Sequence, residues 1–142
     1  MATEFAGSFL SDDVRSFLTT IPRYATIATV NPDGSPHQIV IWFVLRGAEL
    51  IVNSRHGRRW PSNLRREERA NLCIYEAEDA VTLDCVLERE YENEGAQADI
   101  AEMARRYDTP EVAVREIERY RTERRLSFVM RPTRVHVHGD PR

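Results

Sequence analysis

The chain has 142 residues, of which 42% are hydrophobic and 30% are charged, and its formal net charge is -3. This composition predicts one soluble globular domain over residues 1–142 and argues against intrinsic disorder. The small negative charge gives no reason to expect a nucleic-acid partner. The longest uninterrupted apolar run, residues 39–45, is far shorter than the ~20 residues of a membrane helix. No basic start followed by an apolar stretch is visible, so we expect no secretory signal and a cytoplasmic location.

The N-terminal half predicts one short helix and an antiparallel meander. Residues 1–10 are expected to form a flexible arm, and Ser11 then provides a hydroxyl N-cap for a helix that Pro22 ends. The turn signals around Gly34 and Gly47 separate three segments of strand-like alternation. These predicted strands cover residues 24–30, 37–45 and 49–53.

The C-terminal half continues this pattern around a helical insert. A short helix is expected over residues 63–66, and residues 91–122 form an acidic helical insert in which Thr109 and Pro110 mark a helix start. Strand character is found at residues 70–76, 80–90, 126–130 and 134–138, with a hinge at 131–133. About six antiparallel strands with short helices predict a mainly β (α+β) fold. Closure into a barrel is favoured because it removes exposed edges.

The basic residues are all of one kind. Each of the 20 residues counted as Lys or Arg is an arginine. The absence of lysine excludes Schiff-base chemistry, a phosphate-binding P-loop lysine and a lysine general base. Codon bias in a GC-rich genome explains this composition without a functional demand. Any anion site must nevertheless use arginine, histidine or backbone N–H groups.

A cluster of arginines follows the third predicted strand. Residues 55–69 contain six arginines and two glutamates, whereas residues 88–123 contain eleven acids and six arginines. A strand end followed by Ser54, Gly57, arginine side chains and a helix start is an arrangement that binds phosphate. The alternative is a solvated loop whose arginines pair with the acidic helices. The residues alone leave both interpretations open.

Other catalytic or binding chemistry has little support. His136 and His138 lie on the same side of a predicted strand, but two ligands do not make a zinc site, and no metal site is expected. Cys73 and Cys85 lie in apolar strand-like contexts and are expected to pack in the core. No nucleophile motif is found. If the protein is an enzyme, we therefore expect a bound cofactor to carry the reaction, with no catalytic side chain assigned.

Four short motifs occur in order between residues 24 and 75. They are an A-T-x-x-P-D-G-x-P-H turn from Ala28 to His37, an apolar strand ending in Trp42-Phe43, the pair Asn53-Ser54, and an N-L-R-R run from Asn63 to Arg66. With these motifs the chain resembles the pyridoxamine-phosphate-oxidase-like, FMN-binding split-barrel superfamily. Within it, the chain is most similar to the deazaflavin (coenzyme F420)-dependent reductase branch. The resemblance extends to the last two predicted strands but not to the arm or the insert.

The resemblance implies a six-stranded antiparallel split β-barrel that forms a homodimer, with two cofactor sites at the subunit interface. It places the flat cofactor ring along the backbone of Val40, Ile41 and Trp42. It places the phosphate at the strand end and the arginine loop that follows. The residues implied at this second position are Asn53, Ser54, Arg58, Arg59 and Asn63, with Asn63 helping to fix the helix.

One position departs from the family pattern. Trp60 stands where the family usually has a lysine, two residues after the arginine equivalent to Arg58. A missing ammonium removes a charge-assisted phosphate contact worth about 1–3 kcal/mol. Trp60 is therefore expected either to stack on the cofactor or to pack in the protein.

The leading hypothesis is an oxidoreductase that passes hydride between reduced F420 and a small planar or unsaturated substrate. An Arg-only groove suits the anionic phosphodiester and acidic tail of F420, and FMN is the alternative cofactor. A second hypothesis is a non-catalytic cofactor-binding or carrier protein on the same barrel, because a fold does not fix a function.

Overall fold

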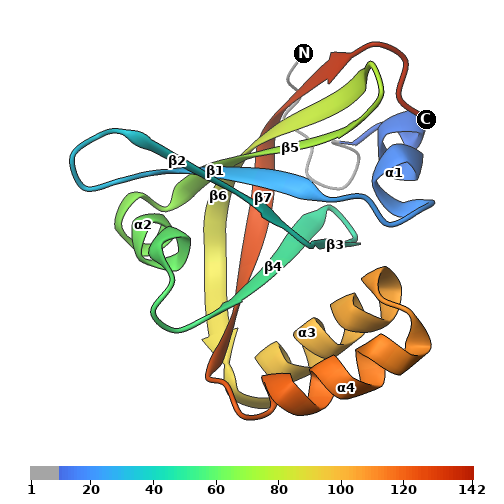
Figure 1. The fold of residues 1–142 in the computed structure, drawn as a ribbon. Helices are drawn as coiled ribbons and strands as arrows, with labels where there is room; N and C mark the ends of the chain where they lie inside the picture. Colours follow the sequence, from blue (N-terminus) through green and yellow to red (C-terminus); the bar gives the residue numbers. More distant parts are fainter. Residues whose placement is uncertain (1–9) are drawn as a thin grey trace.

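The computed structural model describes residues 10–142, so the arm expected at residues 1–10 lies, except for Leu10, outside the described residues. Within the described part of the chain the fold is mainly β with four helices, as predicted (Figure 1). The helices are α1 (Asp12–Thr19), α2 (Arg59–Glu67), α3 (Asn93–Tyr107) and α4 (Pro110–Tyr120). The strands are β1 (Ala25–Val30), β2 (Pro36–Ile41), β3 (Val44–Arg46), β4 (Glu49–Arg55), β5 (Arg69–Glu76), β6 (Asp79–Glu92) and β7 (Arg125–His138).

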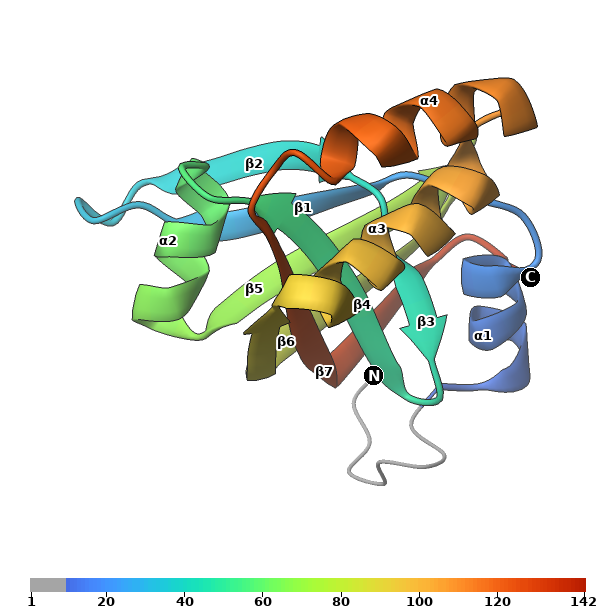
Figure 2. The same cartoon turned by 90° about the horizontal axis from the view of Figure 1, so that it is seen from below.

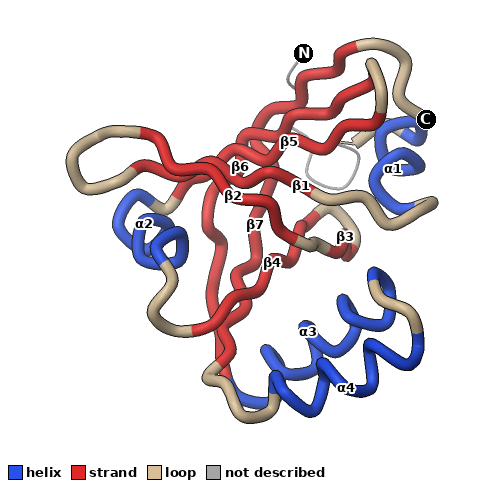
Figure 3. Tube along the Cα trace, viewed as in Figure 1, coloured by secondary structure: helices blue, strands red, loops and turns tan. Residues whose placement is uncertain are grey.

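The strands form one antiparallel sheet in the order β2-β1-β5-β6-β7-β4-β3. The two edge strands of the sheet, β2 and β3, are consecutive in the chain, with only Trp42 and Phe43 between them. The sheet therefore curves, and this brings its two edges close together. The tube in Figure 3 follows this curvature. The result is a split barrel, and it has seven strands where the family resemblance implied six.

The additional strand arises because the predicted strand at residues 37–45 is two strands. β2 pairs with β1 only as far as Ile41, whereas β3 begins at Val44 and pairs with β4. Phe43 lies between them and is only 1% exposed, so the chain turns here to place this side chain in the core. An uninterrupted apolar run looks the same whether or not the strand changes its partner. The break between Ile41 and Val44 could therefore not be predicted from the run.

The predicted hinge at residues 131–133 is also wrong, because β7 is one continuous strand that pairs with both β6 and β4. Pro132 lies opposite Cys85, next to a register shift between Asp84 and Cys85. Proline has no N–H to donate, and an irregular point in the ladder accommodates it without ending the strand.

Local signals set several element ends as predicted. The Ser11 hydroxyl accepts a hydrogen bond from Val14 N at 3.2 Å and caps α1. Thr109 caps α4 in the same way, with Pro110 at the first helical position. Gly34 adopts a φ of +90° in the β1–β2 turn, a conformation that favours glycine. α2 is longer than predicted because it begins at Arg59, four residues before the predicted start.

Two groups of buried side chains hold these elements together. The first fills the barrel and includes Phe17 of α1, Leu72 of β5 and Phe128 of β7. The second lies between the α3–α4 pair and the other face of β4 and β7, where Met103 and Val129 are buried. Figures 1 and 2 both show α3 and α4 running side by side, while α1 and α2 lie at opposite ends of the barrel. No helix within residues 10–142 has both the length and the apolar composition needed to cross a membrane.

Candidate functional site

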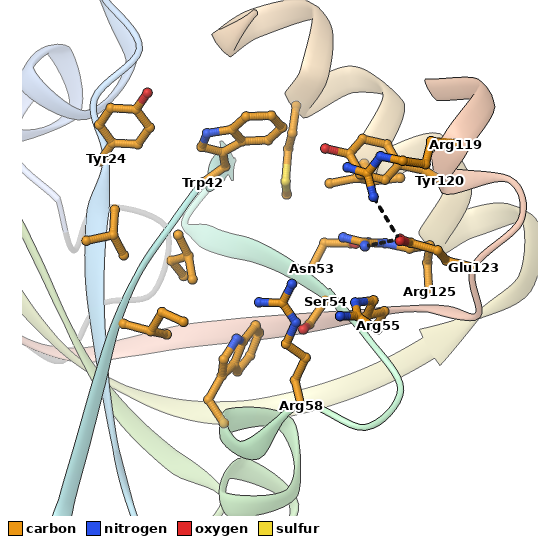
Figure 4. A pocket seen from close by; sticks show the side chains of 16 residues that line it. Tyr24, Trp42, Asn53, Ser54, Arg55, Arg58, Arg119, Tyr120, Glu123 and Arg125 are labelled. Atoms are coloured by element: carbon orange, nitrogen blue, oxygen red, sulfur yellow. Dashed lines mark hydrogen bonds and ion pairs between the residues drawn. The ribbon is translucent and has the colours of Figure 1, made fainter. Parts of the chain in front are cut away.

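A pocket of about 270 Å³ lies between the β2 edge of the sheet, the end of β4 and the α3–α4 pair (Figure 4). Its walls combine arginine side chains with aromatic and aliphatic ones. Four arginines and one glutamate line it, so the lining has a formal excess of three positive charges in a chain whose net charge is -3. The pocket is therefore suited to an anionic ligand that also has an apolar part.

The first cationic part of the pocket lies where β4 ends and α2 begins. Arg55 ends β4, Gly57 turns the chain with a φ of +94°, and Arg58 is the N-cap residue of α2. Arg55 and Arg58 are exposed, and among residues 10–142 neither has a carboxylate partner. Figure 4 shows the Arg58 side chain pointing from the start of α2 toward Ser54 and Asn53. These uncompensated guanidinium groups are available to an anion.

The second cationic part lies at the junction of α4 and β7. Glu123 accepts one hydrogen bond from Arg125 Nη1 at 2.7 Å and one from Arg119 Nη1 at 3.0 Å. The guanidinium carbons of both arginines lie within 5 Å of the centre of the Tyr120 ring, at 4.9 Å and 4.8 Å. Burial lowers the pKa of Arg125, and its contact with Glu123 opposes that effect. Glu123 thus holds two arginines of the pocket wall.

A buried polar chain fixes Arg125 from behind. Asn53 Oδ1 accepts a hydrogen bond from Arg125 Nε at 3.0 Å, and its Nδ2 donates to Ser127 Oγ at 2.9 Å and to Ala96 O at 3.0 Å. Ser127 Oγ in turn donates to Asp99 Oδ2 at 2.6 Å. Since the Asn53 amide makes these three bonds within the protein, it positions Arg125 and has little capacity left for a ligand.

Asp99 anchors this chain to α3. Its carboxylate is 3% exposed and accepts hydrogen bonds from Tyr91 Oη at 2.5 Å and from Arg46 Nη2 at 2.7 Å, in addition to the bond from Ser127. Burial and the hydrogen bond to Asp99 raise the pKa of Tyr91. A buried carboxylate with this set of donors is a rigid support for the residues it holds.

An aromatic stack forms the opposite part of the wall. The rings of Trp42 and Tyr107 are stacked with centroids 5.1 Å apart and planes at 5°, and Tyr24 stacks on Tyr107 at 5.7 Å. Tyr107 Oη donates to Arg23 O at 2.6 Å, and burial raises the pKa of this phenol. Trp42 and Tyr24 line the pocket, so Tyr107 holds flat aromatic surfaces beside it.

The sequence of residues 10–139 matches the family model described as pyridoxamine 5'-phosphate oxidase. The chain belongs to the pyridoxamine 5'-phosphate oxidase family. This confirms the resemblance inferred from the motifs between residues 24 and 75. A search of curated proteins gives no match.

Solved structures with a similar fold differ in what they bind. An F420 reductase is 20% identical with a TM-score of 0.68, and the alignment covers 85% of this chain and 94% of that one. A conserved hypothetical protein from Mycobacterium tuberculosis is 18% identical with a TM-score of 0.74, over 97% and 90% of the two chains. The heme storage protein HutZ from Vibrio cholerae is 19% identical with a TM-score of 0.67, over 93% and 96%. At these identities the likeness is one of fold.

Within the pyridoxamine 5'-phosphate oxidase fold, most of the residues implied by the motifs come together. Those that line the pocket are Val40, Ile41, Trp42, Asn53, Ser54, Arg58 and Trp60. Arg59 and Asn63 do not line it. The Asn63 amide donates to Thr29 Oγ1 at 3.1 Å and to Asn31 Oδ1 at 3.0 Å, which fixes α2 to the β1–β2 hairpin.

Trp60 lines the pocket with little of its surface. It is 2% exposed and packs on Phe128 with ring centroids 5.5 Å apart and planes at 58°. Of the two roles expected for this residue in place of the family lysine, packing is the one that the structure shows. The phosphate contact that the resemblance implies for a lysine at this position has no counterpart in this side chain.

The sequence assigned no individual residue to the helical side of the pocket. Met103, Arg119, Tyr120 and Arg125 all line it, and each lies after the motifs that carried the family resemblance. Arg119 and Tyr120 end α4, and Arg125 begins β7, so their place depends on how α3 and α4 pack against the sheet. For this region the sequence showed only an excess of acids over arginines, eleven against six in residues 88–123, and this assigned none of the four residues to a site.

Proposed function

We propose that this protein is an oxidoreductase that binds coenzyme F420 and transfers hydride to a small planar or unsaturated organic substrate. The main support is the pocket itself, in which Arg55 and Arg58, which have no carboxylate partner among residues 10–142, lie across from an aromatic wall that includes Trp42. Membership of the pyridoxamine 5'-phosphate oxidase family and the fold shared with an F420 reductase point in the same direction.

The chain's own residues fit an anionic, ring-bearing cofactor. The phosphodiester would be held by Arg58, with the Ser54 hydroxyl and the first backbone N–H groups of α2 beside it. β2 is an edge strand, so alternate residues among Val40, Ile41 and Trp42 direct N–H and C=O groups away from β1. Such groups hydrogen-bond the polar edge of a flat heterocycle, and this agrees with the position implied by the family resemblance.

In this proposal the side chains orient the reactants and exclude water. When bound, F420 supplies the hydride. Trp42, held flat by Tyr107, presents an aromatic surface that suits a planar substrate, and Ile100 and Met103 make that part of the pocket apolar. No catalytic side chain is assigned, and the proton comes from solvent or from a side chain that is not identified.

FMN is the alternative cofactor on the same residues, and a non-catalytic carrier is the alternative function. The carrier alternative is favoured by one observation, the fold shared with the heme storage protein HutZ. The residues that line this pocket include neither histidine nor cysteine. This lining favours an anionic flavin-type ligand over a heme with a nitrogen or thiolate ligand.

We further propose that the protein is a homodimer. Val40, Thr26, Cys73, Thr82 and His136 are successive cross-strand partners, so they form a lane on one face of the sheet. The first four are uncharged, and Val40 is 61% exposed although it also lines the pocket. A second copy seated on this lane would lie beside the pocket. Light scattering coupled to size exclusion tests this, and a monomer at all concentrations would refute it.

The cofactor proposal is tested with one substitution and three cofactors. The purified protein is titrated with F420, FMN and FAD, with fluorescence quenching and calorimetry as readouts. Arg58→Ala is expected to weaken F420 binding about 10- to 100-fold, because it removes a charged hydrogen bond. Arg59→Ala is the matched control, since Arg59 lies next in sequence but outside the pocket. Equal affinities for the two variants would show that the phosphate lies elsewhere, and binding without turnover of reducible substrates would favour the carrier.

A further inference from the structure

Arg125 differs from the other arginines of the pocket in being buried and fixed. It is 9% exposed, whereas Arg119 is 53% exposed at its side chain, and Arg55 and Arg58 are exposed. Its Nε donates to Asn53 Oδ1 and its Nη1 to Glu123 Oε1. Among residues 10–142, its Nη2 has no acceptor, although Arg125 lines the pocket. A guanidinium held in this way has N–H groups left for a ligand.

The surroundings of Arg125 are built at some energetic cost. Burying a guanidinium is unfavourable unless its charge and hydrogen bonds are used. Here the Asn53 amide, Ser127 and the buried carboxylate of Asp99 form a continuous chain behind it. This chain sets the direction of the guanidinium plane before any ligand enters, which lowers the entropy lost on binding.

Glu123 indicates which ligand chemistry the site accepts. Its two carboxylate oxygens are divided between Arg125 Nη1 and Arg119 Nη1, so a carboxylate already lies at the edge of the pocket between two guanidinium groups. The Glu123 side chain is 19% exposed, and it belongs to the short connection between α4 and β7. A ligand carboxylate that reaches Arg125 would compete with Glu123 for the same donors. Glu123 would then act as an internal counter-ion.

Arg119 is held by two carboxylates, since its Nε donates to Glu116 and its Nη1 to Glu123. We infer that Arg125, whose Nη2 is left for a ligand, forms a second anion subsite of this pocket, which selects substrates that carry a carboxylate next to a planar, conjugated group. The inference deepens the proposed function and rests on it, because the planar group would lie by Trp42 and the cofactor ring. Arg58 and Arg55 serve the cofactor phosphate, and the α4–β7 junction serves the substrate. Planar guanidinium groups bind carboxylates with two parallel hydrogen bonds, and a neutral amide of the same shape lacks this interaction.

The test compares cinnamate with cinnamamide, which have the same planar skeleton and differ in charge. Each is titrated calorimetrically into the protein with and without oxidised F420. The wild-type protein is expected to bind the acid at least about tenfold more tightly than the amide. Arg125→Gln should reduce this preference to below about threefold. Arg115→Gln, on the exposed side of α4 and outside the pocket, should leave it unchanged.

A second variant keeps the test decisive if Arg125→Gln fails to fold. Glu123→Gln leaves Arg125 in place and removes the competing carboxylate. It should strengthen cinnamate binding by about three- to tenfold, with little effect on cinnamamide. If Glu123 had a purely structural role, Glu123→Gln would weaken the binding of cinnamate and of cinnamamide together. The two substitutions are thus expected to move the acid preference in opposite directions.

The experiment distinguishes failure of the carboxylate subsite from failure of the proposed function. Equal affinity of the wild-type protein for acid and amide, an unchanged preference in Arg125→Gln, or a lower preference in Glu123→Gln would each overturn the subsite. Loss of F420 binding in Arg125→Gln as large as its loss of cinnamate binding would also overturn it, because Arg125 would then serve the cofactor's acidic tail. If F420 does not bind at all but the acid preference depends on Arg125, the subsite stands and the proposed function is overturned.

Discussion

Asp99 offers a direct test of how much the buried polar chain contributes to stability. Asp99→Asn keeps the size of the side chain and one oxygen but replaces the other oxygen with an amide N–H₂ group. Oδ2 accepts hydrogen bonds from Tyr91 Oη at 2.5 Å and Ser127 Oγ at 2.6 Å, whereas Oδ1 accepts from Arg46 at 2.7 Å. The substitution therefore leaves an acceptor for Arg46 and places an N–H₂ group against two hydroxyl donors.

The magnitude follows from the number of bonds lost and their burial. Two hydrogen bonds to a charged acceptor are lost, each worth about 1.5–3 kcal/mol, and rotation of a hydroxyl recovers part of this. We expect the free energy of unfolding to fall by about 2–4 kcal/mol. A domain of this size is stable by about 5–15 kcal/mol, so the loss is large.

Urea denaturation followed by tryptophan fluorescence and circular dichroism measures this loss, with Glu102→Gln as the matched control. Glu102 also bonds to Arg46, at 2.5 Å, but its side chain is 51% exposed. An exposed pair with this arginine contributes about 0–1 kcal/mol, so the control should change stability little. Equal losses for the two variants would refute the reasoning. The contribution of Asp99 would then come from its contact with Arg46 alone.

Two further predictions concern the aromatic residues. Trp60→Ala should cost about 3–5 kcal/mol of unfolding free energy because Trp60 is buried against Phe128, whereas Trp42→Ala should cost less and weaken cofactor binding about 2- to 10-fold. Denaturation and cofactor titration of both variants check this, and stronger destabilisation by Trp42→Ala would contradict it. Burial raises the pKa of Tyr107 above the ordinary value of about 10, so the folded state retains this proton more strongly and stability should fall as the pH rises above about 10. Tyr107→Phe should reduce that alkaline slope in unfolding measurements between about pH 9 and 11, and an unchanged slope would assign it to other groups.

Much of the fold could be predicted because its signals are local. Ser11 and Thr109 each cap the helix that follows them, and Gly34 supplies the positive φ of a hairpin turn. A residue type that suits a cap or a turn acts through neighbours three or four positions away. The residue types that favour such contacts can therefore be recognised from a short stretch of sequence.

The errors in the predicted strands occurred where pairing with a strand distant in sequence sets the strand bounds. The break after Ile41 depends on the change of pairing from β1 to β4, and the continuity of β7 through Pro132 depends on a register shift in its ladder with β6. In both places the local pattern correctly predicted extended structure but did not show which strand is the hydrogen-bonding partner. One predicted strand is thus two and two predicted segments are one strand, although the positions of extended structure were largely correct.

The residues of the candidate site also fall into those that local sequence identifies and those that depend on distant contacts. Arg58 and Ser54 could be identified because they lie within one strand-loop-helix segment. Arg125 is separated from Asn53 by 72 positions, and its role depends on a bond that forms only when β4 and β7 pair. The excess of acids in residues 88–123 gave no means of selecting Arg119 or Arg125 from the other arginines there.

The position of β7 has a consequence for how the molecule assembles during translation. The first six strands fall into two hydrogen-bonded groups, β2-β1-β5-β6 and β4-β3, and only β7 joins them. On the ribosome, the β3–β4 hairpin must therefore wait without a neighbour while some 70 further residues, from 56 to 124, are added before β7. During that interval the edge of β4 that later pairs with β7 has its backbone N–H and C=O groups open to pairing with another chain.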